Sequence, residues 1–133
     1  CAAALENISV IHESNLVENA AEMGKYLEVE VEKLMQKHPS IGDFRNTGLL
    51  GCIELVKDRE TKEPVTPWNA SHGEMEPTLR MAAKMKELGM FTFVRWNWIF
   101  IAPPLIITKE QIDEGLNIIS QVIEIADEYY TGS

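Results

Sequence analysis

The chain has 133 residues, a single domain by length, and its 45% hydrophobic and 25% charged residues are typical of a globular protein. Its 21 acidic and 12 basic side chains give a net charge of -9, which disfavours nucleic acid as a partner because phosphate is repelled. No apolar stretch approaches the roughly 20 residues that span a bilayer, so we expect no membrane partner either.

The first predicted element is a helix from Cys1 to about His12, because apolar residues recur there at helical spacing. Its opening letters, CAAALENI, are typical of a helix interior and contain no N-cap residue. We therefore expect this chain to be part of a larger protein. A second helix should begin at Asn15, since Glu18 completes a capping-box pattern, and should end before Pro39.

Two strands are predicted next, one around Asp43–Arg45 and a longer one over Leu50–Val56, with a turn at residues 46–48. Cys52 lies in the apolar run of the longer strand and is predicted to be a small buried thiol. The polar stretch KDRETKEPVTPWNASHGE then shows no periodicity. We expect it to be a loop that is either functional or mobile.

A third helix is predicted from about Glu74 to Leu88, with four residues facing inward: Met75, Leu79, Ala82 and Leu88. The segment MFTFVRWNWIFIA then alternates aromatic and β-branched residues, which predicts a hairpin that folds back at Trp96-Asn97.

The double proline Pro103-Pro104 ends this hairpin strand, because proline donates no backbone hydrogen bond. Thr108 and Gln111 form a capping box that starts a final, long apolar-striped helix. The order α-α-β-β-α-β-β-α predicts an α+β fold, in which helices cover one face of a small, mostly antiparallel sheet.

Few side chains form a chemical motif in the sequence. No two histidines have metal-ligand spacing, so we expect each at the surface, and no serine has a neighbouring base to activate it. These residues are His12, His38 and His72, and Ser14, Ser40, Ser71 and Ser120. The two cysteines form no metal or redox motif and no signal peptide is recognisable, so we expect a cytoplasmic protein.

Arg95 is the best candidate for a binding residue, because it lies in the aromatic hairpin beside Phe93 and Trp96. A guanidinium framed by aromatic rings can bind a carboxylate or a sulfonate through two hydrogen bonds. The alternative is that Arg95 stacks on Trp96 or Trp98 and only stabilises the hairpin.

Three segments resemble, in this order, the C-terminal portion of class III aminotransferases, which are fold-type I pyridoxal phosphate enzymes. They are CAAALENI, FRNTGLLGCIELVKDRETKEP and GMFTFVRWNWIFIAPPLIITKEQIDEGL. The most specific pieces are the pattern G-x-x-G-x-I-E-L and the exit A-P-P-L-I-I-T into a capped helix. The nearest likeness is to the ω-amino acid–pyruvate and taurine–pyruvate branch.

The resemblance implies that residues 1–133 are the small C-terminal domain of a homodimeric enzyme, with residues 1–13 the end of an inter-domain helix. It implies that the lysine which binds the cofactor lies upstream of Cys1, so the fragment alone is expected to bind no pyridoxal phosphate and to be inactive. The implied parent reaction moves an amino group from an ω-amino acid, an amine or a taurine-like donor to a keto acid such as pyruvate.

The resemblance also implies a role for specific residues. In the family, an arginine before the Pro-Pro strand binds the substrate carboxylate. Arg95 is the candidate here, although an ungapped count back from Pro103 places that arginine at Phe93. Phe93, Trp96 and Arg45 are expected to line the pocket, Arg45 at its rim or in a structural role. A second class of function stays open, a non-catalytic α+β ligand-binding or regulatory domain, because these residues hold no complete active site.

Overall fold

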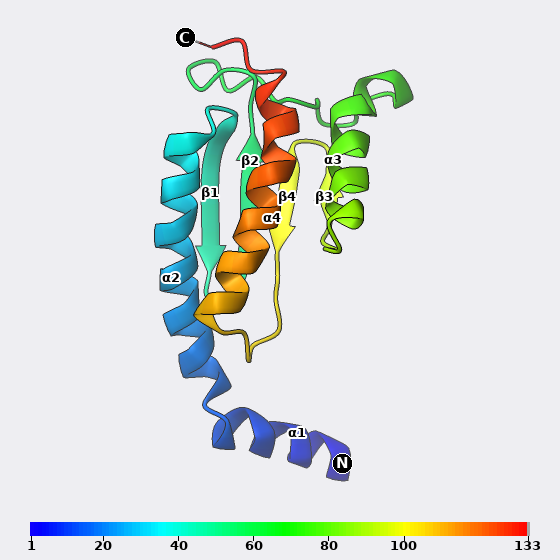
Figure 1. Ribbon diagram of the computed structural model, residues 1–133. Helices are drawn as coiled ribbons and strands as arrows, with labels where there is room; N and C mark the ends of the chain where they lie inside the picture. Colours follow the sequence, from blue (N-terminus) through cyan, green and yellow to red (C-terminus); the bar gives the residue numbers. More distant parts are fainter. Residues whose placement is uncertain (133) are drawn as a thin grey trace.

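The computed structural model describes residues 1–132 and contains the predicted helices and strands in the predicted order (Figure 1). Their bounds are α1 (Ala2–Glu13), α2 (Leu16–Lys37), β1 (Ile41–Thr47), β2 (Leu50–Leu55), the 3-10 helix η1 (His72–Met75), α3 (Glu76–Glu87), β3 (Val94–Arg95), β4 (Trp98–Ile101) and α4 (Lys109–Asp127).

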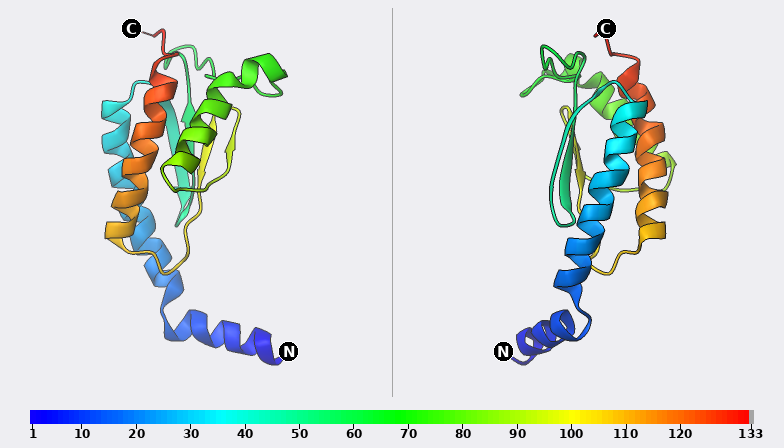
Figure 2. Two further views of the ribbon diagram at one scale, coloured as in Figure 1. Left: turned by 45° about the vertical axis from the view of Figure 1, so that its right-hand side comes forward. Right: turned by 90° about the vertical axis from the view of Figure 1, so that its left-hand side faces the viewer.

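The strands form one sheet in the order β1-β2-β4-β3, and every neighbouring pair is antiparallel. Helices α2, α4 and α3 lie on one face of this sheet, which confirms the predicted α+β class (Figure 2). Alternate strand residues point into this layer and form the core with apolar residues of the helices: Ile53, Leu55, Ile99 and Ile101 from the sheet, and Leu27, Val31, Met81, Met85, Ile112, Leu116, Ile119 and Ile123 from the helices.

Helix α2 lies unusually close to the turn between β1 and β2. A Cβ atom added to Gly24 would be 2.5 Å from the carbonyl oxygen of Gly48, so only glycine fits there. Gly48 itself has φ +56°, which the tight turn requires. The turn therefore comes slightly later than predicted, and β1 is longer than the predicted Asp43–Arg45 because its pairing with β2 extends from Ile41 to Thr47.

Helix α1 projects away from the rest of the molecule (Figure 1) and has no buried residue. The predicted capping box at the start of α2 is wrong. Asn15 adopts the left-handed conformation, with φ 49° and ψ 42°, and its side chain makes no capping hydrogen bond. A capping residue needs extended backbone, whereas the bend between α1 and α2 uses the tolerance of asparagine for positive φ.

The inward face predicted for α3 is wrong for Leu79, which is 51% exposed, and for Ala82, whereas Leu88 packs against the core. The helix proper begins at Glu76 and buries Thr78, whose hydroxyl donates to the carbonyl oxygen of Trp96 at 2.6 Å and accepts from the Thr66 hydroxyl at 2.9 Å. These tertiary contacts rotate the helix away from the face that its own sequence favours. The capping box of α4 at Thr108 and Gln111 is confirmed.

His38 was expected at the surface and is buried, with only 2% of its area exposed. It follows the last residue of α2 and contacts Ser120 and Asp127 of α4. These residues are more than 80 positions away, so local sequence carries no sign of the contact. None of the helices in the described part of the chain combines the length and apolar character that crossing a bilayer requires.

Candidate functional site: the open face of the sheet

In the described part of the chain, no helix covers the face of the sheet opposite α2, α3 and α4 (Figure 2). We call it the open face. Strand pairing aligns its side chains in two rows that cross the sheet. The first row runs Arg45, Cys52, Phe100, Phe93, and the second runs Asp43, Glu54, Trp98, Arg95.

Aromatic rings form a continuous series along one side of the open face. Ring centroids are 5.4 Å apart between Phe93 and Phe100, and 6.4 Å between Phe100 and Trp98. Trp96 follows at 5.3 Å from Trp98, and Trp68 at 5.7 Å from Trp96. All pairs are tilted or edge-on, the geometry that the ring quadrupole favours. The open face therefore carries a large apolar surface at positions where a solvated sheet would carry polar side chains.

Arg95 stacks on this series, with its guanidinium carbon 4.2 Å from the centroid of the Trp96 ring. No ion pair joins Arg95 to a carboxylate within residues 1–132. The stacking on Trp96 that the sequence analysis gave as the alternative is thus present. The N–H donors of Arg95 remain available to an added anion, because stacking uses the face of the guanidinium and leaves its edges open.

Trp96 occupies the hairpin turn with φ 52°, a backbone conformation that a bulky side chain rarely adopts. The hydroxyl of Thr78, a residue of α3, donates a hydrogen bond to the carbonyl oxygen of Trp96. Strain of this kind persists where the surroundings fix it, and it concentrates at functional sites. The predicted hairpin is confirmed, and its turn presents Trp96 and Arg95 together.

Arg45 has a different environment from Arg95. Its guanidinium bonds Glu54 at 2.6 Å and lies 3.3 Å from Asp43, both on the open face. Its charge is already matched by two carboxylates. The structure thus gathers Phe93, Arg95 and Trp96 at the β3–β4 end of the sheet and places Arg45 at the opposite edge, with β2 and β4 between them.

Cys52 was predicted to be buried and is only partly so, because strand alternation turns it to the open face while Ile53 points into the core. Burial raises the pKa of the Cys52 thiol, and the Glu54 carboxylate raises it further. The thiol lines a shallow hollow of about 240 Å³ together with Arg45, Leu50 and Phe100.

Trp68 is a site residue that sequence reasoning missed. It comes from the loop between β2 and η1, is 66% exposed, and packs on Trp96. The available signal was a large aromatic residue in an otherwise polar loop, a combination that solvation alone does not favour. The predicted loop is real, and Trp68 extends the open face.

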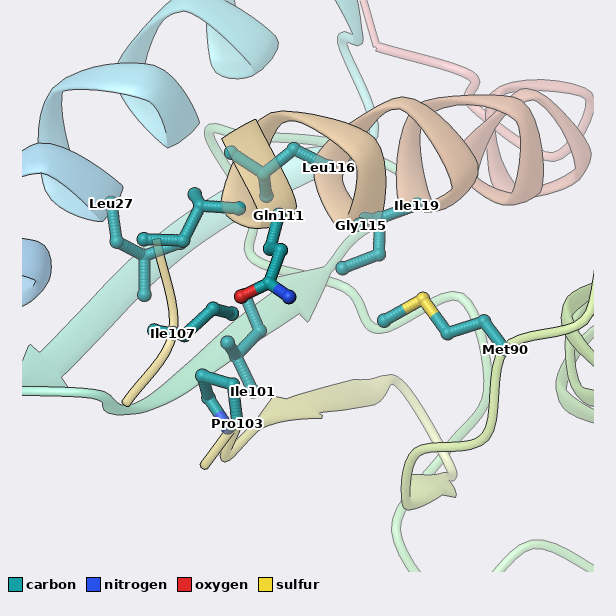
Figure 3. A pocket seen from close by; sticks show the side chains of 10 residues that line it. Leu27, Met90, Ile101, Pro103, Ile107, Gln111, Gly115, Leu116 and Ile119 are labelled. Carbon is teal, nitrogen blue, oxygen red and sulfur yellow. The ribbon is translucent and has the colours of Figure 1, made fainter. Parts of the chain in front are cut away.

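A second hollow lies on the covered side, between the start of α4 and the exit of β4 (Figure 3). It is lined by apolar side chains such as Met90, Ile101 and Leu116, with the amide of Gln111 directed into it. Its volume is about 60 Å³, well below the roughly 300 Å³ of a typical ligand site. We regard it as a packing hollow.

The described residues offer no group of three or more metal-binding side chains in one place. They also do not fit pyridoxal phosphate by themselves, because none of the lysines in residues 1–132 is buried. Several of these lysines pair instead with surface carboxylates, as Lys33 does with Glu30 and Lys109 with Glu22.

This chain is similar to known proteins in both sequence and structure. The family described as aminotransferase class-III matches residues 1–123. A taurine–pyruvate aminotransferase of Bilophila wadsworthia is 41% identical over 114 residues, covering 85% of this chain and 25% of the relative. A leucine/methionine racemase of Thermococcus litoralis is 34% identical over 131 residues, covering 98% of this chain and 28% of the relative.

Among solved structures, a taurine:2-oxoglutarate aminotransferase from Bifidobacterium kashiwanohense, in complex with PLP and glutamate, superposes with a TM-score of 0.86. It is 34% identical, and the match covers 96% of this chain and 28% of that protein. The chain thus spans only about a quarter of the length of the relatives it matches.

Proposed function

Because this chain belongs to the class-III aminotransferase family, we propose that residues 1–133 are the small C-terminal domain of a pyridoxal phosphate-dependent aminotransferase, with residues 1–13 the end of an inter-domain helix. The parent enzyme moves an amino group from an ω-amino acid, an amine or a taurine-like donor to a keto acid such as pyruvate. It acts as a cytoplasmic homodimer, a state that light scattering on the full-length protein tests.

The observation that supports this function best is the open face. Its aromatic series and the guanidinium of Arg95 occupy one end of a sheet face that no described element covers. A face of this composition suits contact with the rest of a larger protein, with Arg95 at the edge of a shared pocket.

Arg95 binds the acid group of the substrate in this proposal. Its available guanidinium donors form two hydrogen bonds with either a carboxylate or a sulfonate. Phe93 and Trp96 flank it with apolar surface, which excludes water and strengthens the ion pair. Arg45 is at the rim, because its two carboxylate partners already satisfy its charge.

The cofactor supplies the chemistry that takes up the amino nitrogen and returns it to the keto acid. We propose that the lysine which binds it lies outside these residues, since every lysine described here is exposed or half-exposed. The contribution of this domain is substrate binding, not the chemical step, so the fragment alone is expected to be inactive.

Two measurements on the full-length protein test the proposal. Reduction with borohydride after incubation with pyridoxal phosphate, followed by mass spectrometry, should give one modified lysine outside residues 1–133. Incubation with taurine or β-alanine and pyruvate should then produce alanine. A protein without any such adduct would instead be a non-catalytic binding domain.

A second candidate reaction is racemisation of an amino acid. It is favoured by the leucine/methionine racemase relative, which matches 98% of this chain at 34% identity. The same full-length protein, incubated with L-leucine and no keto acid, would then form D-leucine. Alanine production that requires pyruvate, without a D-amino acid, selects the aminotransferase.

A further inference from the structure

A chain of hydrogen bonds joins three side chains on the side of the molecule away from the open face. His38, after the end of α2, has Nδ1 2.6 Å from Asp127 Oδ2 and Nε2 2.8 Å from Ser120 Oγ. Serine, imidazole and carboxylate within hydrogen-bond reach, in this order, are the arrangement that activates a serine hydroxyl as a nucleophile. No base near Ser120 was predicted from the sequence.

The available hydrogen-bond donors fix which atom donates and which accepts in these bonds when His38 is neutral. The Lys37 ammonium carries donors only and bonds Ser120 Oγ at 2.8 Å. The hydroxyl hydrogen of Ser120 is then directed at His38 Nε2, which accepts it. Nδ1 therefore carries the imidazole hydrogen and donates it to Asp127. This is the tautomer in which Nε2 can take the serine proton.

Asp127 is held on both of its oxygens. While Oδ2 accepts from His38, Oδ1 accepts from the backbone N–H of Ser40 at 3.2 Å and from its hydroxyl at 2.6 Å. The carboxylate cannot rotate away without breaking all three bonds. It orients the imidazole, which is the role of a positioning residue.

Ser120 also has an approach from solvent. Its side chain is 5% exposed and lines a surface hollow of about 330 Å³. Other charged groups of this hollow already have partners: Lys33 pairs with Glu30, and Asp113 accepts from the Tyr26 hydroxyl. Lys37 is the cation that lies directly at the Ser120 oxygen.

We propose that Ser120 is a reactive serine that accepts a short acyl group from a carboxylic ester. Its oxygen attacks the ester carbonyl and forms a C–O bond while its proton passes to His38 Nε2. The negative charge on the carbonyl oxygen lies beside Lys37. The ester C–O bond then breaks, and the leaving alcohol takes the proton from His38. Water repeats the sequence, releasing the acid and restoring Ser120.

The same geometry limits the rate. Ser120 lies within α4, so its own backbone N–H is used inside the helix and does not stabilise the oxyanion. Each missing oxyanion donor lowers the rate by roughly 10²–10³-fold. We therefore expect slow acylation that a covalent probe detects more readily than turnover.

The test uses the full-length protein and a biotinylated fluorophosphonate, which marks activated serines. Peptide mapping by mass spectrometry should place the adduct on Ser120. Ser120→Ala should abolish that adduct, and Asp127→Asn should slow labelling by roughly 10²-fold, because the general base loses its orientation. Ser14→Ala, at an exposed serine, should label like the wild type.

Ile99→Ala separates reactivity from a structural role. It opens a cavity in the core and lowers the thermal midpoint, yet leaves the Ser120–His38–Asp127 hydrogen bonds in place, so labelling should continue at a comparable rate. Folded wild-type protein without an adduct on Ser120 would overturn the proposal, and this result depends on no variant. Equal labelling of a folded Asp127→Asn protein would overturn the role of Asp127.

Discussion

The two faces of the sheet are made by alternate residues of the same strands, yet they differ in almost every property. On the covered face, Ile53 and Ile99 are fully buried beneath the helices. On the open face, their neighbours Cys52, Glu54 and Phe100 remain partly exposed beside two arginines. The covered face carries mainly aliphatic side chains, whereas the open face combines aromatic rings, the Arg45 guanidinium paired with carboxylates and the Arg95 guanidinium without such a partner in the described part of the chain.

This difference shows that one sheet serves two purposes. The aliphatic face contributes most of the folding free energy, since burial of such side chains is worth roughly 25 cal/mol per Å². The open face keeps apolar rings where an antiparallel sheet facing water would alternate to polar residues. Its composition therefore agrees with the contact to a larger protein that we propose for this face.

The largest expected effect is a difference in the free energy of unfolding between substitutions at two consecutive residues of β4. Ile99→Ala should lower the free energy of unfolding by about 2–5 kcal/mol, because it leaves a cavity in the core. Phe100→Ala, one position along, should cost roughly 1 kcal/mol, since its ring is already partly exposed. Urea denaturation of the 133-residue chain measures both. Equal losses would contradict the division between the faces.

Arg95→Ala tests the function assigned to the open face. In the full-length enzyme, loss of the charged hydrogen bonds should raise KM for the acidic substrate by roughly 10–100-fold, about 1.4–2.8 kcal/mol. The isolated chain should unfold almost unchanged, because only the stacking on Trp96 is lost. Arg45→Ala, which removes the other arginine of the open face, is the matched control, and a larger KM effect there would move the acid contact to that position.

Cys52 reports whether the open face is covered in the parent. Its raised thiol pKa leaves less thiolate at neutral pH, so alkylation by iodoacetamide should be slower than for Cys1 and should accelerate as the pH rises. In the full-length protein, the Cys52 reaction should slow several-fold more, since a second layer blocks access. Equal rates in both proteins would indicate that this face stays open to solvent.

Arg45→Ala should have the smallest effect. The pair with Glu54 is exposed, so it is expected to contribute only about 0.2–1 kcal/mol to stability, and less at high salt. Thermal unfolding at low and high ionic strength measures this. A loss of substrate affinity comparable to that of Arg95→Ala would place Arg45 in the pocket and not at its rim.

Most of the fold followed from local patterns. The order of elements, the hairpin at Trp96-Asn97 and the Thr108 capping box depend on periodicity, proline and side-chain caps, which act within a few residues. The errors occurred where a distant contact outweighed the local preference. Thr78 turned α3 toward Trp96, and the bend at Asn15 replaced the predicted cap.

Only part of the candidate site could be predicted from the sequence. Arg95, Phe93 and Trp96 are close along the chain, so their grouping was readable, whereas their relation to Arg45 depended on strand order. Trp68 joined them through a loop that has no periodicity to interpret.

The sequence by itself determined the elements and which residues of each strand are apolar, because these depend on short-range sterics and alternation. Only the tertiary structure decided which face is covered, and that His38 lies buried between Ser120 and Asp127. The physical reason is that such contacts join residues more than 80 positions apart. Their free energy appears only when the helices pack, so no local pattern encodes them.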